Sequence, residues 1–268
     1  MGVLNGDLLV HCHCYRADEI LMILDVAREH GFRIAALQHV LEGYRVAPEI
    51  AASGAGASTF SDWWGYKVEA FDAIPHNAAM MTRAGIVTSI NSDLTEQIRR
   101  MAVEAGKTMK YGALSEHEAF AQVTLNPAVQ LGIASRVGTI APGKDGDLAI
   151  FNGHPFSPYS RCVLTLIDGE AVFDARSAPD HSTKDFAPAR RARRDPGPLP
   201  RTGTILILNA TLHPITAPPL RGSILIRDGK IAYVPLFTDF EVVVVPPLGK
   251  LETIVTAGGL STAPWSFL

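Results

Sequence analysis

The 268-residue sequence has few cysteines, no excess of basic charge and no long apolar run. Three cysteines cannot make a disulfide framework, so we expect Cys12, Cys14 and Cys162 to be reduced thiols. A net charge of −3 argues against a nucleic-acid partner. No apolar stretch approaches the roughly 18 residues that cross a bilayer, so we expect no membrane span. Residues 1–7 lack the basic and apolar regions of a signal peptide, which leaves the cytoplasm as the default expectation for location.

What the sequence does contain is a recurring pattern in which a short apolar segment ends in a polar residue. One such segment ends at His11, a second at His39 and a third at Asp93, while a fourth, residues 57–60, leads into an aromatic loop. Helical or loop sequence follows each segment, and this alternation predicts parallel βα units. Because the carboxyl ends of parallel strands share one edge of a sheet, we expect His11, His39 and Asp93 to lie close together.

Several helices can be placed between these strands. Residues 19–30 carry an amphipathic pattern that ends at Gly31, and Ser115 begins a capping box with Glu118. Further helices are expected over residues 48–53, from Pro75 to Gly85, and over residues 95–105.

The chemistry of the three strand-tip residues is that of a metal site. Neutral imidazole nitrogen and carboxylate oxygen suit Zn²⁺ and similar divalent ions, and Asp93 could also accept a proton from a bound water. Simpler interpretations remain open. A histidine at a strand end can be an ordinary hydrogen-bonded residue, Asp93 can be a helix N-cap, and the Trp63–Trp64 pair can be a lid or part of the core.

From Val137 onward the sequence changes to short strands and glycine-rich turns. Asp168–Gly169 and Asp228–Gly229 each lie between two apolar segments and predict hairpins with type I′ turns. The segments expected to be strands are residues 148–151, 163–167, 171–173, 205–208, 223–227, 230–234 and 242–245. Each half of this β-rich part is marginal alone, so we predict that residues 137–173 and 204–245 pack together as one module.

Several motifs together resemble the amidohydrolase superfamily, and within it the imidazolonepropionase-like amidohydrolases. The segments at residues 10–13, 37–39 and 89–93 resemble strands five, six and eight of that superfamily's barrel. The run over residues 124–149 is similar to the superfamily's passage into its β-sandwich.

The resemblance implies an α/β fold, namely a partial TIM-type (β/α) barrel of about four βα units, strands five to eight, with a small β-sandwich module. The implied domains are a partial barrel over residues 1–136, a sandwich segment over 137–174, a Pro/Arg-rich linker over 175–203 and a second sandwich segment over 204–268, which resembles an amidohydrolase N-terminus.

The implied function is that of a metal-dependent amidohydrolase acting on a small-molecule amide or cyclic amide. His11 and His39 would bind a divalent metal, with zinc the first choice, and Asp93 would both bind metal and act as general base. The residues expected to contact the substrate are His13, Arg16, Tyr44, Trp63 and Asn91.

The sequence also departs from the superfamily pattern. The superfamily has a His-x-His pair on its first strand and often a bridging Lys or Glu on its fourth, and no further strands precede residue 8 here. His11-Cys12-His13 could be that first pair, but only three further βα units follow, which favours strand five. We therefore expect a fragment with weak or no activity alone. Its open sheet edges would favour homo-oligomers. The alternative is a non-catalytic remnant or an interaction module of a tandem amidohydrolase.

Overall fold

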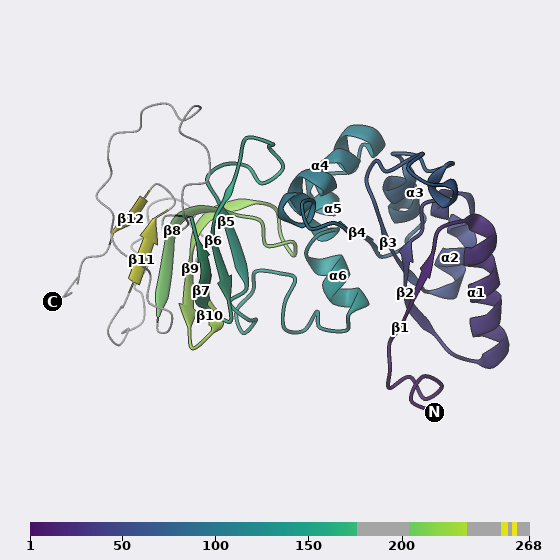
Figure 1. Cartoon of the computed structure of the whole chain (residues 1–268). Coiled ribbons are helices and arrows are strands. Elements are labelled where there is room, and N and C mark those ends of the chain that lie inside the picture. The colour runs from purple at the N-terminus through teal and green to yellow at the C-terminus, as the bar shows by residue number, and fades with distance from the viewer. Residues whose placement is uncertain (176–203, 235–252, 257–258, 262–268) are drawn as a thin grey trace. The chain divides into compact units, whose positions relative to one another are not determined.

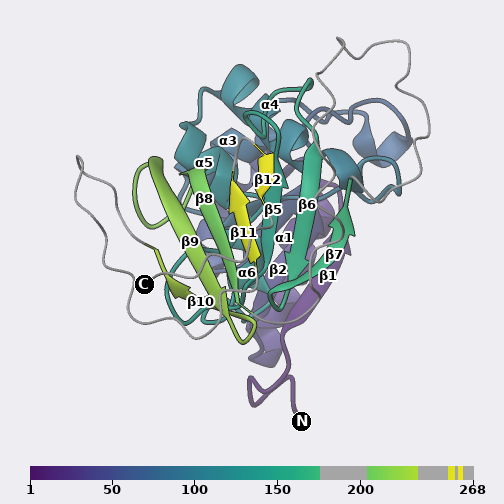
Figure 2. The same ribbon diagram turned by 90° about the vertical axis from the view of Figure 1, so that its left-hand side faces the viewer.

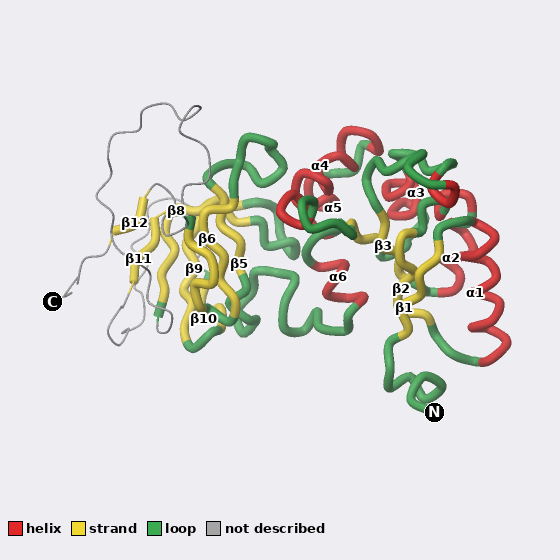
Figure 3. Tube along the Cα trace, viewed as in Figure 1, coloured by secondary structure: helices red, strands yellow, loops and turns green. Residues whose placement is uncertain are grey.

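The first part of the chain builds a parallel sheet covered by helices. The computed structural model describes residues 1–175, 204–234, 253–256 and 259–261, which divide into two units. Unit 1 contains residues 1–139 and 156–158, and unit 2 contains residues 140–155 and the described residues from 159 onward. Among the described residues all α-helices belong to unit 1, whereas unit 2 consists of strands and loops (Figure 3). No helix of the described part has the length and apolar character needed to cross a membrane.

Four strands of unit 1 pair in parallel in the order β1-β2-β3-β4, which confirms the α/β class. They are β1 (Val10–Cys14), β2 (Ile34–His39), β3 (Gly56–Thr59) and β4 (Thr88–Ile90). The helices between and after them are α1 (Ala17–His30), α2 (Ala47–Ser53), α3 (Asn77–Arg83), α4 (Met101–Gly112), α5 (Glu116–Ala121) and α6 (Leu125–Gln130). Short 3₁₀ turns occur at η1 (Gly43–Arg45), η2 (Val68–Ala70) and η3 (Ile98–Arg100).

The core of unit 1 lies between the sheet and the first two helices, which run side by side (Figure 1). Helix α1 buries Ile20 and Ala27 on the face that packs toward β2. It ends at Gly31, whose φ of 72° is the left-handed conformation that glycine adopts without a steric cost. The capping box of α5 forms as predicted, because Ser115 accepts a hydrogen bond from the Glu118 amide.

The prediction of a helix over residues 95–105 is wrong at both its start and its end. A 3₁₀ turn occupies residues 98–100, and α4 begins at Met101 and continues to Gly112. Gly106, which directly follows the predicted end, lies inside the helix. A Cβ atom at Gly106 would lie 3.0 Å from Cβ of Phe156, so the glycine permits a close contact there and is not a helix stop.

Unit 2 contains two sheets. The first is antiparallel in the order β5-β6-β7, and the second has the order β10-β9-β8-β11-β12 (Figure 2). The strands are β5 (Leu148–Phe151), β6 (Cys162–Ile167), β7 (Glu170–Asp174), β8 (Ile205–Leu212), β9 (Leu220–Arg227), β10 (Lys230–Tyr233), β11 (Thr253–Thr256) and β12 (Gly259–Ser261). Asp168 and Asp228, like the glycines after them, have positive φ angles, as type I′ turns require. The strand predicted over residues 242–245 and nearly all of the linker over 175–203 lie outside the described residues.

The two β-rich segments of unit 2 share one hydrophobic core. Leu164 and Leu166 from β6 pack in the same cluster as Ile205 from β8 and Ile226 from β9. The segments are also joined by an ion pair between the buried carboxylate of Asp145 and the ammonium of Lys230.

Candidate active site at the strand tips

Two histidines meet where β1 and β2 end. The register of this parallel pair places Cys14 opposite His39, so His13 lies one residue before the matching tip. Nδ1 of His13 is 2.6 Å from Nε2 of His39, a hydrogen bond in which one ring donates and the other accepts. A pair of imidazoles is therefore fixed at the carboxyl edge of the sheet.

The backbone at the end of β2 holds His39 in a sharp left-handed bend. His39 has φ of 74° and the following Val40 has φ of 39°, an uncommon conformation for a β-branched residue. Hydrogen bonds to both backbone groups of Val40 hold this bend, including one from the Gly43 amide to its carbonyl at 3.0 Å. The Val40 amide donates to the Cys14 carbonyl at 2.9 Å, the Asn77 side-chain amide donates to the Val40 carbonyl at 2.8 Å, and Asn77 also donates to the Thr59 hydroxyl at 3.1 Å.

The His39 ring is enclosed by aromatic side chains. Tyr15 stacks on it with centroids 4.5 Å apart, and Phe60 stacks on it at 5.4 Å. Trp63 continues the stack on Phe60 at 4.7 Å and packs against the small core there, whereas Trp64 is half exposed. Of the two tryptophans, Trp63 thus belongs to the packed interior of the site.

Burial and neighbouring charges favour a neutral His39. The side chain is only 5% exposed, and burial is the main cause that lowers its pKa. The charges of His13 and Lys67 lower that pKa further, while Asp93 lies close enough to oppose them. Metal ligation requires a deprotonated imidazole nitrogen, which a neutral imidazole has. Its Nδ1 atom is buried and has no hydrogen-bond partner among the described residues.

His11 occupies a different place from His13, although strand alternation puts both on one face of β1. Nδ1 of His11 lies 3.0 Å from the side-chain amide nitrogen of Gln38. The structure thus pairs His39 with His13, and it pairs His11 with a glutamine of β2.

Asn91 and Tyr44 also lie beyond strand tips. Asn91 follows β4 and donates from its side-chain amide to the Ser58 hydroxyl at 2.9 Å, while its Oδ1 is buried without a partner in the described part of the chain. The Tyr44 hydroxyl donates to the Asp72 carbonyl at 3.0 Å. Tyr44 therefore supports the loop after β3.

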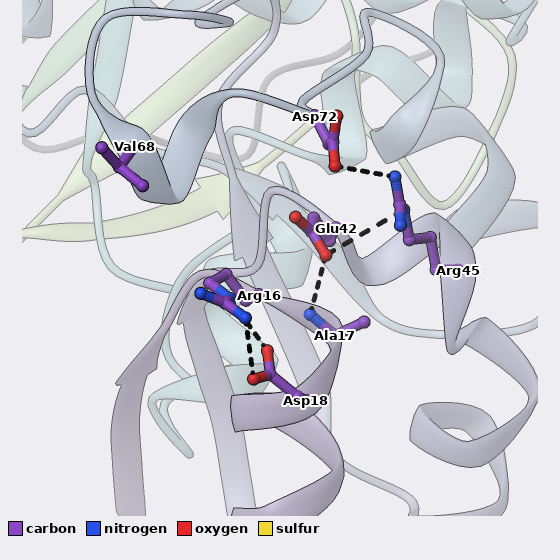
Figure 4. A pocket seen from close by; sticks show the side chains of 7 residues that line it. All are labelled: Arg16, Ala17, Asp18, Glu42, Arg45, Val68 and Asp72. Atoms are coloured by element: carbon purple, nitrogen blue, oxygen red, sulfur yellow. Dashed lines mark hydrogen bonds and ion pairs between the residues drawn. The ribbon is translucent and has the colours of Figure 1, made fainter.

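A pocket of about 390 Å³ opens beside this site (Figure 4). Its charged groups neutralise one another: Arg16 pairs with Asp18 at 3.0 Å, Arg45 pairs with Asp72 at 3.0 Å, and Glu42 accepts a hydrogen bond from the first amide of α1. The full lining is Arg16, Ala17, Asp18, Glu42, Arg45, Val68 and Asp72. Of the residues predicted to contact substrate, only Arg16 lines it, and neither histidine of the pair does.

Sequence reasoning missed Tyr15, Lys67 and Asn77. Tyr15 directly follows the first strand, so its place after a strand tip was the available signal. Lys67 lies in the aromatic loop, and the sequence pattern of that loop indicates aromatic packing but no role for a lysine. Asn77 acts through buried hydrogen bonds to residues 37 and 18 positions away, which no local pattern reveals.

The donors at the strand tips fit a divalent ion such as Zn²⁺. Two imidazole nitrogens that share a tetrahedral zinc lie about 3.3 Å apart, given zinc–nitrogen bonds of about 2.0–2.1 Å. The His13 and His39 nitrogens are 2.6 Å apart, so the two rings would have to move apart by less than about 1 Å to admit an ion between them. The charge of Asp93 also acts on His39, and a carboxylate oxygen is a further ligand type that zinc accepts.

Comparisons with known proteins agree on one family. Residues 70–188 match the model of the amidohydrolase family. The chain is 34% identical over 181 residues to the amidohydrolase tasK of Hapsidospora irregularis, and 25% identical over 166 residues to an imidazolonepropionase of Thermoplasma volcanium. The crystal structure of an amidohydrolase from Thermotoga maritima superposes with a TM-score of 0.59 at 30% identity.

All three similarities cover part of each protein. The match to tasK covers 65% of this chain, the match to the imidazolonepropionase covers 59%, and the match to the Thermotoga protein covers 65%. The chain spans 18% of tasK, 40% of the imidazolonepropionase and 45% of the Thermotoga protein.

Proposed function

We propose, from the premise that this chain belongs to the amidohydrolase family, that its strand tips carry the metal-binding part of a hydrolase acting on carbon–nitrogen bonds other than peptide bonds. The substrate class is a small amide or cyclic amide. The observation that carries the proposal is the contact between the His13 and His39 imidazoles at the ends of adjacent parallel strands, with Asp93 close to His39.

In this proposal His13, His39 and Asp93 hold one divalent ion, with zinc the first choice. His13 takes the role that the sequence motif assigned to His11. A divalent ion held there would lower the pKa of a bound water and polarise the amide carbonyl. The stacked rings of Tyr15 and Phe60 keep the His39 imidazole in one orientation and exclude water from its faces.

Asp93 is the proposed general base. A carboxylate at the strand tip can accept the proton of the attacking water and return it to the leaving nitrogen. Asn91, with an unsatisfied buried oxygen two residues before Asp93, is a proposed hydrogen-bond acceptor for a substrate N–H.

The test is zinc binding by the purified chain, measured by calorimetric titration and metal analysis. We expect one ion per chain, about tenfold or greater weakening in His13→Ala, and loss of binding in His39→Ala. His11→Ala is the matched control, expected to change the affinity less than threefold. Loss of binding in His11→Ala with normal binding in His13→Ala would return the ligand role to His11. An absence of zinc binding in the parent chain would contradict the proposal.

We also propose that the isolated chain hydrolyses amides weakly. It spans less than half the length of each relative compared, so the site as a whole would include groups beyond those on this chain. In the described sheet β1 and β4 are edge strands, and unpaired edges favour self-association, which analytical ultracentrifugation would detect. Turnover of a simple acyl amide that His39→Ala abolishes would support catalysis by this chain. Zinc binding without turnover would favour the alternative, a non-catalytic interaction module.

A further inference from the structure

A lysine lies against the aromatic stack of the proposed site. Nζ of Lys67 is 3.7 Å from the centroid of the Tyr15 ring and 5.5 Å from that of Tyr66. Tyr15 is the residue that stacks on His39, and Tyr66 packs edge-on against Trp63. Lys67 therefore brings a positive charge to within one aromatic ring of the His13–His39 pair.

The loop that carries Lys67 is fixed at both ends. At its start the Ser61 hydroxyl donates to the Glu104 carbonyl at 2.6 Å, and Asp62 pairs with Lys107 at 3.0 Å. At its end Asp72 pairs with Arg45 at 3.0 Å. Between them the Gly65 amide donates to the Ala70 carbonyl at 2.9 Å, which closes the turn around Lys67. A charge on an anchored loop is pre-positioned for a ligand.

Lys67 differs from the neighbouring cations in its partners. Arg16, Arg45 and Lys107 all form ion pairs with carboxylates. In the described part of the chain Lys67 forms no ion pair: its ammonium lies over the Tyr15 and Tyr66 rings, and the Glu69 carboxylate acts on it only through its charge. The hydrogen bond to Tyr15 is the main cause that raises the pKa of Lys67, so the side chain is cationic at neutral pH.

We propose that Lys67, held on Tyr15, is a specificity-determining residue that binds a carboxylate group of the substrate next to the amide to be cleaved. The inference rests on the proposed function for the identity of the site. It adds that the substrate is anionic, an N-acyl amino acid or a related carboxylated amide. An ammonium that forms no ion pair with a protein carboxylate gains most from a ligand that supplies one, because a charge-assisted hydrogen bond is about twice as strong as a neutral one.

The test compares two probes that differ only in charge, N-acetyl-L-alanine and N-acetyl-L-alaninamide, in NMR titrations of the full chain. We expect the carboxylate to bind about tenfold more tightly than the neutral amide, with a preference that falls as salt is added. Lys67→Met keeps the apolar stem on the aromatic rings and should reduce the preference to less than about twofold. Lys67→Arg should retain most of it. The control is Lys110→Met, since Lys110 lies 5.3 Å from the Tyr111 ring on α4 and should leave the preference unchanged.

Equal binding of the two probes, no binding of either, or an unchanged preference in Lys67→Met would overturn the inference. Circular dichroism of Lys67→Met confirms that the variant is folded, and the Lys67→Arg variant supplies the same comparison if it is not. Zinc titration separates this result from the proposed function. Normal zinc binding without carboxylate preference contradicts only the role of Lys67, and carboxylate preference without zinc binding contradicts only the metal site.

Discussion

The side chain of Asn77 binds the bend that carries His39: its amide nitrogen donates to the Val40 carbonyl at 2.8 Å. The same side chain accepts a hydrogen bond from the Tyr44 amide at 2.8 Å and is 1% exposed. One residue at the start of α3 thus binds the backbone of the bend and that of the turn that follows it. The left-handed conformation of His39 and Val40 persists because these bonds stabilise it.

We predict that Asn77→Ala lowers the free energy of unfolding by about 3 kcal/mol, because it leaves the Tyr44 amide without its acceptor and removes one of the two donors to the Val40 carbonyl. Urea denaturation measures the effect. Asn77→Asp is a useful comparison: it retains the acceptor for Tyr44 but sets a carboxylate oxygen against the Val40 carbonyl at a site that is 1% exposed, so it should be at least as destabilising as the alanine variant. A loss below about 1 kcal/mol in Asn77→Ala would mean that the bend does not depend on this side chain.

A second prediction concerns the capping box of α5 and its dependence on pH. Hydrogen bonds from Ser115 are the main cause that lowers the pKa of Glu118, and burial opposes them. Because the folded-state pKa is lower than the unfolded one, the contribution is present above the ordinary glutamate pKa of about 4.3. It is lost as the pH falls through the folded-state pKa. Ser115→Ala should cost about 1 kcal/mol at pH 7, and denaturant titrations should show that cost shrinking below about pH 4. A cost independent of pH would exclude the Glu118 carboxylate from the effect.

Much of unit 1 follows from local sequence. Strand β2, helix α1 with its stop at Gly31, and the capping box at Ser115 depend on neighbouring residues, and each is where the pattern placed it. The predicted end of this helix at residue 105 is wrong because Gly106 has the local signature of a helix stop, while its contact with Phe156 is set by tertiary packing.

The candidate site depends on contacts that the local sequence cannot predict. His11 and His13 lie on one face of β1, so alternation alone cannot say which of them reaches His39. The answer depends on where the strand ends and on its register with β2, which pairs Cys14 with His39. The place of Lys67 against Tyr15 depends on a loop fold that joins residues 52 positions apart. Such contacts leave no periodicity in the sequence.

The two cysteines of β1 should differ in reactivity. Burial raises the pKa of Cys14 to about 12, with a smaller contribution from Cys12, and the side chain is 4% exposed. Burial also raises the pKa of Cys12, which is only partly buried. We predict that iodoacetamide at pH 8 modifies Cys12 well before Cys14, because the thiolate is the reactive form. Peptide mapping by mass spectrometry measures both rates, and guanidinium should make them equal. Equal rates in the native chain would contradict the burial of Cys14.

The last prediction concerns unit 2, whose two β-rich segments share a core across a stretch of chain outside the described residues. Ile226 of β9 is fully buried in the cluster that also contains Leu164 and Leu166 of β6. Truncation of this side chain to alanine should lower the free energy of unfolding of unit 2 by about 3 kcal/mol. The amides of β6 should then lose hydrogen-exchange protection together with those of β9, since one core stabilises both. The control is Ile167→Ala, because Ile167 on β6 is 49% exposed and should cost less than about 1 kcal/mol. If Ile226→Ala increased exchange in β8 and β9 but left β6 unchanged, the two segments would be independent, and the shared core would contribute little to the stability of β6.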